Sequence, residues 1–138
     1  MKEAELKDIL FRFIKDNYKR EEYHSTRIEA WQKVGLPDWN LCIGGADLWL
    51  ENKIAANKVT FQDVQVSWLY QHSRAGGLSY IVVADPTQKV IRTFRGSQSR
   101  EVAKDGARET EPFLQMQLYP DRIELQYWLD VITMGATL

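Results

Sequence analysis

The chain has 138 residues, of which 44% are hydrophobic and 27% charged, as is ordinary for one soluble globular domain. A net charge of −1 excludes a globally basic nucleic-acid binder, so any DNA contact must come from a local patch. The single cysteine, Cys42, excludes an intramolecular disulfide and a cysteine-based zinc site. No apolar run approaches the roughly 18 residues of a membrane span. The charged start MKEAELKD does not resemble a signal peptide, so we expect a cytoplasmic, intracellular protein.

Residues 3–16 predict an amphipathic helix, because apolar side chains recur there at helical spacing. The stripe consists of Leu6, Ile9, Leu10, Phe13 and Ile14. Residues 17–34 mix charged and aromatic side chains without a clean period. We therefore expect an irregular or partly extended connection there.

The stretch GLPDWNLCIGGADLWLENK, residues 35–53, predicts a β-hairpin closed by Gly44-Gly45. If these glycines form the whole loop, Asp38 faces Glu51 and Lys53 shares their side of the sheet. Like charges directly opposed in a sheet are destabilising. A divalent cation with Lys53 nearby would offset this repulsion, so the pattern suggests a metal site. A longer loop would place Asp38 opposite Lys53 instead, but would keep the two carboxylates as neighbours.

A second helix is predicted from a capping box at Thr60–Asp63 to about Arg74, with a packing stripe of Val64, Trp68 and Leu69. Gly76-Gly77 favours its end. Residues 79–84 predict an interior strand because they are apolar and uncharged. After a turn at residues 85–88, residues 89–94 alternate as a more exposed strand.

The remaining residues predict a short helix near 99–104, a strand within 113–119 and a last helix capped by Asp121 with Glu124. The apolar face expected for that helix is Ile123, Tyr127, Trp128, Val131 and Ile132, and Gly135 ends it. The order of elements predicts an α/β fold around a small mixed β-sheet flanked by helices.

Five elements in order resemble the PD-(D/E)XK nuclease superfamily, and most closely its VRR-NUC branch, which includes small stand-alone phage proteins. They are Glu5-Leu6 with the first helix, Gly35-Leu36-Pro37-Asp38, the Gly44-Gly45 turn, Glu51-Asn52-Lys53, and Gln65 with Trp68 and Gly76-Gly77. The resemblance covers roughly residues 3–84 and implies a restriction-endonuclease-like core. We therefore expect one nuclease domain over residues 1–138. Its core motifs lie in 1–94, and 95–138 form an extension that packs on the core or serves dimer formation or specificity.

The resemblance implies that Asp38, Glu51 and the backbone carbonyl of Asn52 bind Mg²⁺ or Mn²⁺. It implies that Lys53 orients the attacking water or stabilises charge on the phosphate, with Gln65 and Glu5 completing or supporting the site. Asn52 departs from the family, which usually has an apolar residue there, and its side chain is expected on the apolar face of the hairpin. Singly, each residue also fits an ordinary turn, ion pair or solvated helix surface.

The function implied is that of a metal-dependent DNA endonuclease, acting as a homodimer on branched or four-way DNA. A site-specific homing or restriction-type endonuclease is a second interpretation. A non-cutting DNA- or protein-binding module on the same fold is a third, although the intact Asp38, Glu51 and Lys53 speak against it. The basic residues expected to contact the DNA backbone are Arg27, Lys33, Lys53, Lys58, Arg74 and Lys89.

The tryptophans predict core or interface positions, with one exception. Trp31, Trp39, Trp68 and Trp128 belong to the first group. Trp49 shares the polar face with Glu51, so it is expected either to stack on a base or to pack against a partner.

Overall fold

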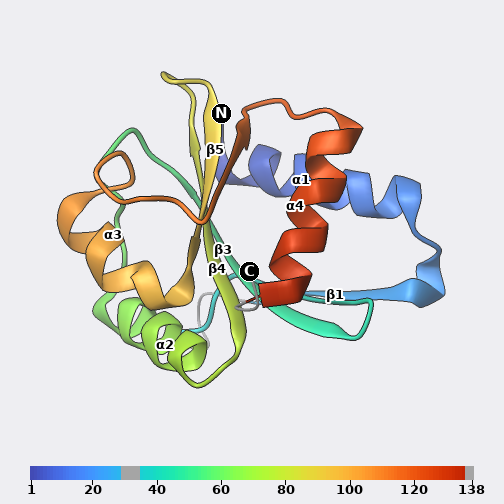
Figure 1. Cartoon of the computed structure of the whole chain (residues 1–138), viewed down its shortest axis with the longest axis horizontal. Coiled ribbons are helices and arrows are strands. Elements are labelled where there is room, and N and C mark those ends of the chain that lie inside the picture. The colour runs from blue at the N-terminus through green and yellow to red at the C-terminus, as the bar shows by residue number, and fades with distance from the viewer. Residues whose placement is uncertain (29–34, 136–138) are drawn as a thin grey trace.

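A computed structural model describes residues 1–28 and 35–135 of the chain, which form a mixed sheet with helices on both faces (Figure 1). The helices are α1 (Glu3–Asn17), α2 (Asp63–Arg74), α3 (Ser99–Asp105) and α4 (Arg122–Met134), with 3-10 turns η1 (Arg20–Glu22) and η3 (Gly96–Gln98). The strands are β1 (Tyr23–Arg27), β2 (Trp39–Ile43), β3 (Ala46–Ile54), β4 (Leu78–Asp85), β5 (Val90–Arg95) and β6 (Leu114–Gln117). No helix in this described part is long and apolar enough to cross a membrane.

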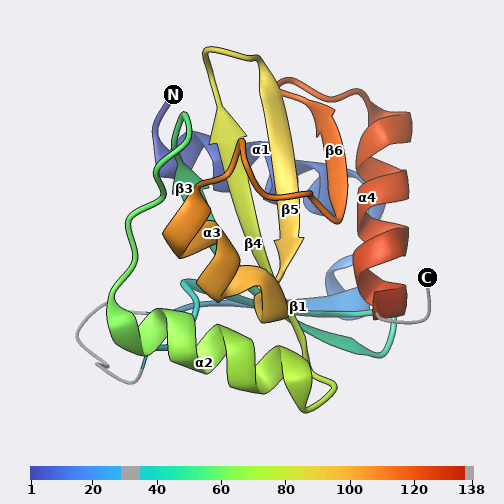
Figure 2. The same ribbon diagram turned by 60° about the vertical axis from the view of Figure 1, so that its left-hand side comes forward.

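The six strands lie in the order of the sequence, from β1 at one edge to β6 at the other. Only β3 and β4 run parallel, because α2 carries the chain across the sheet between them. Helices α1 and α4 cover one face and α2 and α3 cover the other (Figures 1 and 2). The predicted α/β class, with a small mixed sheet flanked by helices, is therefore confirmed.

Each face of the sheet has its own apolar core, because side chains alternate along a strand. On the side of α1 and α4 the buried residues include Leu48, Leu50 and Val82. On the side of α2 and α3 they include Ile81 and Val83. The polar side chains of β2 and β3 therefore point to the face that α2 covers.

The predicted hairpin is confirmed, and its register is the one that a two-residue loop requires. Trp39 pairs with Leu50 and Ile43 with Ala46. Gly44 and Gly45 have φ values of 57° and 79°, a left-handed conformation that favours glycine at both positions. The alternative with a longer loop is therefore wrong.

The N-terminal half otherwise follows expectation, with one added strand. Helix α1 buries Leu6, Leu10, Phe13 and Ile14, as predicted. The segment expected to be irregular or partly extended contains strand β1, which pairs antiparallel with β2. The predictions for Trp31 and Lys33 fall outside the described residues.

Helix α2 begins later than predicted. Its N-cap is Gln62, and the side chain of Gln65 accepts the backbone N–H of Gln62 at 3.2 Å. The predicted pair of Thr60 and Asp63 is therefore wrong, because the longer side chain at Gln65 reaches back to close the first turn. Val64 is 49% exposed rather than part of the packing stripe, and only Leu69 is fully buried in this helix.

In the C-terminal half the predicted elements are present, but two buried faces differ. Strand β5 is mostly buried rather than exposed, because its side chains pack into both cores, Ile91 on one face of the sheet and Phe94 on the other. In α4, Ile123 and Tyr127 were predicted to be buried but are 81% and 63% exposed. Leu125 and Leu129, which were not predicted, are buried in the core instead. The helix cap is as predicted, with Asp121 Oδ1 accepting the N–H of Glu124 at 2.8 Å.

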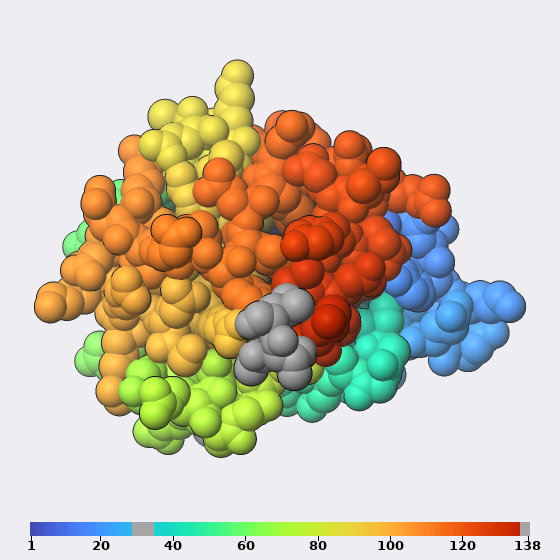
Figure 3. Space-filling model, in the orientation of Figure 1, coloured from blue at the N-terminus to red at the C-terminus, as the bar shows by residue number. Residues whose placement is uncertain are grey.

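The residues after 95 form α3, β6 and α4, of which β6 joins the sheet beside β5. In the space-filling view they form a continuous surface from α3, in orange, to α4, in red (Figure 3). Trp128 of α4 is buried against β5, where its indole N–H donates to Thr93 Oγ1 at 3.0 Å.

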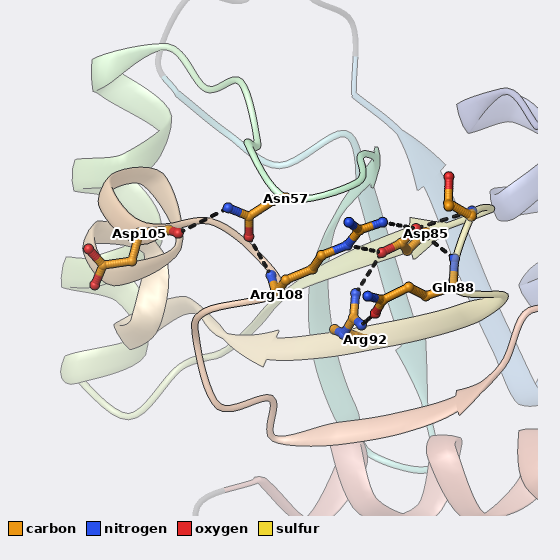
Figure 4. A network of polar contacts seen from close by, with 7 residues as sticks. Asn57, Asp85, Gln88, Arg92, Asp105 and Arg108 are labelled. Atoms are coloured by element: carbon orange, nitrogen blue, oxygen red, sulfur yellow. Dashed lines mark hydrogen bonds and ion pairs between the residues drawn. The ribbon is translucent and has the colours of Figure 1, made fainter.

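A buried carboxylate, Asp85, ties the end of β4 to its neighbours (Figure 4). Its Oδ2 accepts from Arg92 at 3.0 Å and from Arg108 at 2.9 Å, and its Oδ1 accepts from Arg108 at 3.2 Å. The backbone N–H groups of Thr87 and Gln88 also donate to it. Although burial opposes ionisation, these partners lower the pKa of Asp85 to about 2.

The same network fastens the loop after β3 to the chain after α3 (Figure 4). Asn57 Oδ1 accepts the N–H of Arg108 at 2.8 Å, and its backbone carbonyl accepts the N–H of Ala107 at 2.7 Å. Its amide nitrogen donates to the carbonyl of Asp105 at 3.4 Å. The loop that leads from β3 to α2 is therefore held by residues far along the chain.

Asp85→Asn is expected to lower the free energy of unfolding by about 3 kcal/mol at neutral pH, because it leaves the buried guanidinium of Arg92 without its carboxylate partner. The folded pKa of about 2 lies below the ordinary value of 3.8. This stabilisation is therefore complete above about pH 4 and is lost as the pH falls through about 2. Urea unfolding of both proteins across this range should show the two curves converging in acid.

Asp8→Asn is the matched control, since it breaks an exposed pair with Arg12 on α1. It should change stability far less than Asp85→Asn. Equal stability of Asp85→Asn and the wild type at neutral pH would contradict the role of the network.

Candidate functional site

Asp38 and Glu51 lie side by side and hold each other in place. Glu51 Oε1 accepts the backbone N–H of Asp38 at 3.1 Å. In return, Asp38 Oδ1 accepts the backbone N–H of Asn52 at 3.3 Å. Each carboxylate is thus fixed by the strand that carries the other, which follows from the register set by the hairpin turn. The structure brings together the two carboxylates that the sequence predicted.

The two carboxylates lie in an environment that disfavours negative charge. Burial, followed by the charge of Glu51, raises the pKa of Asp38 to about 7. Burial also raises the pKa of Glu51, although Lys53 acts in the opposite direction. A pair of this kind is stable in its ionised form only with additional positive charge nearby.

Lys53 and Gln65 both contact Glu51. Lys53 Nζ lies 3.2 Å from Glu51 Oε2 and sits over the ring of Phe61, 5.1 Å from its centroid. Gln65 Nε2 donates to the same carboxylate oxygen at 3.4 Å. Since Gln65 Oε1 accepts the N–H of Gln62, the amide is oriented by its own helix N-terminus. The structure therefore brings Lys53 and Gln65 together at Glu51.

The structure does not bring Glu5 to this pair. Instead, the charge of Glu3 raises the pKa of both Asp38 and Glu51. The two residues point to different sides of α1, because positions two apart in a helix are separated by about 200°. One turn after Glu3, Lys7 lies near Asp38 and lowers its pKa. Glu3 and Lys7 are four positions apart and so lie on one side of α1, whereas the family resemblance had indicated Glu5.

Asn52 lies between the two catalytic candidates of β3, with its side chain on the opposite, apolar face. It is fully buried, and neither its oxygen nor its nitrogen has a hydrogen-bond partner among the described residues. This agrees with the orientation expected from the sequence. An unpaired buried amide costs free energy, so Asn52 destabilises the strand that carries the site.

Asn52→Val is expected to raise the free energy of unfolding by about 1 kcal/mol, because it removes the unpaired amide and suits a strand. Urea unfolding measures the change. Asn57→Val is the matched control, because the amide of Asn57 is hydrogen-bonded, and that variant should be less stable than the wild type. A loss of stability in Asn52→Val would show that its amide has a partner.

The donor set fits a divalent cation of the Mg²⁺ type. Such ions are bound in proteins through one or two carboxylates, with waters and substrate oxygens filling the other positions. Asp38 and Glu51 supply the two carboxylates, and the carbonyl of Asn52 is the third predicted ligand. No group of three or more acidic, histidine or cysteine side chains is placed to hold a metal within the described ranges.

The basic residues predicted to contact DNA fall into different places. Arg27 ends β1 beside the candidate site, where the N–H of Ile28 donates to the carbonyl of Asp38 at 2.9 Å. Lys58 is exposed in the loop before α2. Arg74 ends α2 and lies over the ring of Tyr70.

Arg100 of α3 also lies over the ring of Tyr70, with its guanidinium carbon 3.7 Å from the ring centroid. Sequence reasoning missed Arg100, because only the packing of α3 on α2 brings it to Arg74. Within the described residues, neither guanidinium has a carboxylate at ion-pairing distance. Two unpaired cations on one aromatic ring form a compact basic surface.

Three aromatic side chains meet beside Glu51 and form what we call the aromatic cluster: Trp49, Trp68 and His72. The ring centroids of Trp49 and Trp68 are 5.5 Å apart, and those of Trp68 and His72 are 4.4 Å apart and stacked. The sequence predicted an exceptional position for Trp49 but gave no signal for His72. Trp39 and Trp128 are buried in the core, as predicted.

A scan against models of known protein families finds no match, and a search of curated proteins finds no relative. Among solved structures, the chain is similar to Hjc, a Holliday junction resolvase from the archaeal hyperthermophile Archaeoglobus fulgidus. The similarity covers 69% of this chain and 76% of the other, with 19% sequence identity and a TM-score of 0.48. At this level of similarity, the chemistry of the site has to be argued from its own geometry.

Proposed function

We propose that this chain is a divalent-metal-dependent endonuclease of the PD-(D/E)XK type that hydrolyses phosphodiester bonds in DNA. The observation that carries the proposal is the pair of Asp38 and Glu51, each fixed by a backbone N–H of the other strand, with Lys53 in contact. Burial of two adjacent carboxylates costs free energy, and a structural role does not require it. A cation-binding role explains why the fold accepts this cost.

Asp38, Glu51 and the backbone carbonyl of Asn52 would hold Mg²⁺ or Mn²⁺. When bound, such an ion polarises a phosphoryl oxygen and lowers the pKa of an attacking water. Lys53 would neutralise charge that develops on the phosphate, because its ammonium group already lies against Glu51. Gln65 would keep Glu51 in position through the hydrogen bond that it donates.

The finer part of the proposal is a structure-selective enzyme for branched or four-way DNA, of the small phage-type VRR-NUC branch, acting as a homodimer. The branch rests on the sequence resemblance of Gln65, Trp68 and Gly76-Gly77 to its motif. Exposed Ile123 and Tyr127 on α4 supply apolar surface that a second copy would cover.

Asp38→Asn and Glu51→Gln are each expected to abolish cleavage, because each removes one of the two charges that hold the cation. Lys53→Met should lower the rate by about a hundredfold, as is typical for loss of one group that stabilises developing charge. Cleavage of linear, nicked, flapped and four-way DNA, with Mg²⁺ or with EDTA, measures both effects. EDTA should stop the wild-type reaction.

Urea unfolding and DNA binding of the same variants provide the controls, since the folded state has to persist. Cleavage by Asp38→Asn at the wild-type rate would overturn the ligand assignment. Cutting at one sequence in linear DNA would favour a homing or restriction-type enzyme. DNA binding without cutting under any metal condition would identify a non-cutting module.

The surface formed by Arg74, Tyr70 and Arg100 is expected to contact DNA phosphates. The double variant Arg74→Ala and Arg100→Ala should bind DNA more weakly. The slope of log affinity against log salt should fall by about 0.9 for each phosphate contact removed. Binding titrations in EDTA at several salt concentrations measure both quantities.

Arg12→Ala is the matched control, since Arg12 is an exposed arginine on α1 that already pairs with Asp8. It should leave the salt dependence unchanged. An unchanged salt slope in the double variant would remove this surface from the DNA contact.

A further inference from the structure

The aromatic cluster adjoins the two carboxylates on the same face of the sheet. Trp49 lies two residues before Glu51 in β3, and side chains two apart in a strand point to the same side, about 7 Å from each other. Trp68 follows Gln65 by three residues in α2, so these side chains also lie on one side of their helix. Any nucleic acid held at the carboxylates therefore passes close to Trp49.

The cluster differs from the aromatic residues of the core. Trp39 and Trp128 are buried, and their indole N–H groups donate to Ser25 and Thr93. The three residues of the cluster are each only half-buried. His72 Nδ1 is buried without a hydrogen-bond partner among the described residues. A purely structural role would bury these rings more completely and would give the His72 nitrogen a partner.

The face of the sheet that carries Trp49 is open toward its β1 edge. Asn40 pairs with Trp49 across the hairpin, and Thr26 of β1 pairs with Asn40. These side chains share one face, because directly paired residues point the same way. Thr26 and His24 are exposed, so α2 does not cover this end of the sheet. In Figure 1, β1 extends away from α2.

Trp49 thus lies between this open polar face and the other two rings of the aromatic cluster. Trp68 and His72 stack on each other with 13° between their planes, whereas Trp49 is tilted by 58° relative to Trp68. No ring within the described residues lies parallel to Trp49. An indole face on which no other ring is stacked can stack on a nucleobase.

The backbone preserves room for this arrangement. A Cβ at Gly77 would lie 2.2 Å from the imidazole ring of His72, so any other residue there would displace the ring. Glycine at this position is explained by the placement of His72, in addition to the end of α2. The cluster is therefore built into the helix–strand connection that follows the site.

We propose that Trp49, supported by Trp68 and His72, stacks on an unpaired nucleobase next to the scissile phosphate. This inference rests on the proposed function and adds its substrate feature. A base within a continuous duplex has both faces covered by its neighbours, so only a base at a branch, flap or single-stranded end is free to take this position. Trp49 is therefore a residue that sets the preference for branched over continuous DNA.

The test compares two DNAs of equal sequence in EDTA, where no cleavage occurs. One is a continuous duplex with a paired 2-aminopurine, and the other presents the 2-aminopurine unpaired at a flap junction. Binding of the wild type should quench the fluorescence of the unpaired probe. Trp49→Ala should abolish the quenching and lower the affinity for the flapped DNA about tenfold more than for the duplex. Trp49→Phe should restore part of both effects.

Tyr119→Ala is the matched control, since Tyr119 is an exposed aromatic residue between β6 and α4. It should leave the quenching unchanged. Equal losses for both DNAs in Trp49→Ala, unchanged quenching, or no DNA binding by the wild type would each overturn the inference. Quenching that depends on Trp49, in a protein that never cleaves DNA with Mg²⁺, would sink the proposed enzyme and leave the base contact standing.

Discussion

The register of the β2–β3 hairpin is the constraint on which the site depends. Two glycines in left-handed conformation allow a two-residue loop, and that loop places every residue of β2 opposite a defined residue of β3. A shift by one residue would turn the side chains to the other face. If β2 slipped by one residue against β3, Asp38 would no longer share a face with Glu51 and Lys53, and the apolar side chains of β2 would leave the core.

Much of this arrangement is readable in the sequence because it follows from local rules. Alternation along a strand predicted the shared face of Asp38, Glu51 and Lys53, and the glycine pair predicted the register that the structure confirms. The apolar stripe of α1 and the Asp121 cap of α4 were equally accessible. In each case, residues within a few positions of one another carry the whole signal.

The features that sequence reasoning missed depend on contacts between distant residues. Gln65 serves two roles at once, closing the first turn of α2 and donating to Glu51, so the helix begins at a place that a simple capping pattern does not give. The charge near the carboxylates comes from Glu3 rather than Glu5, which only the docking of α1 decides. Arg100 reaches Arg74 through tertiary packing alone.

The C-terminal residues also bear on the site, although they match no nuclease motif. Lys53 lies near the end of β3 and Gln65 in the first turn of α2, so the loop between these elements sets the distance between two groups that contact Glu51. Asn57, in the middle of that loop, is held by Ala107 and Arg108, and Arg108 is held in turn by Asp85.

A loop that is fixed at both ends and at its centre has few other conformations, so little further entropy is lost when Gln65 is held at the site. The buried network at Asp85 therefore offsets the cost of the buried carboxylates in two ways: it stabilises the sheet that carries them, and it restrains the chain that delivers Gln65. The carboxylates themselves are held by the hairpin register and by backbone N–H groups, so they stay in place although the amide of Asn52 is buried without a partner among the described residues.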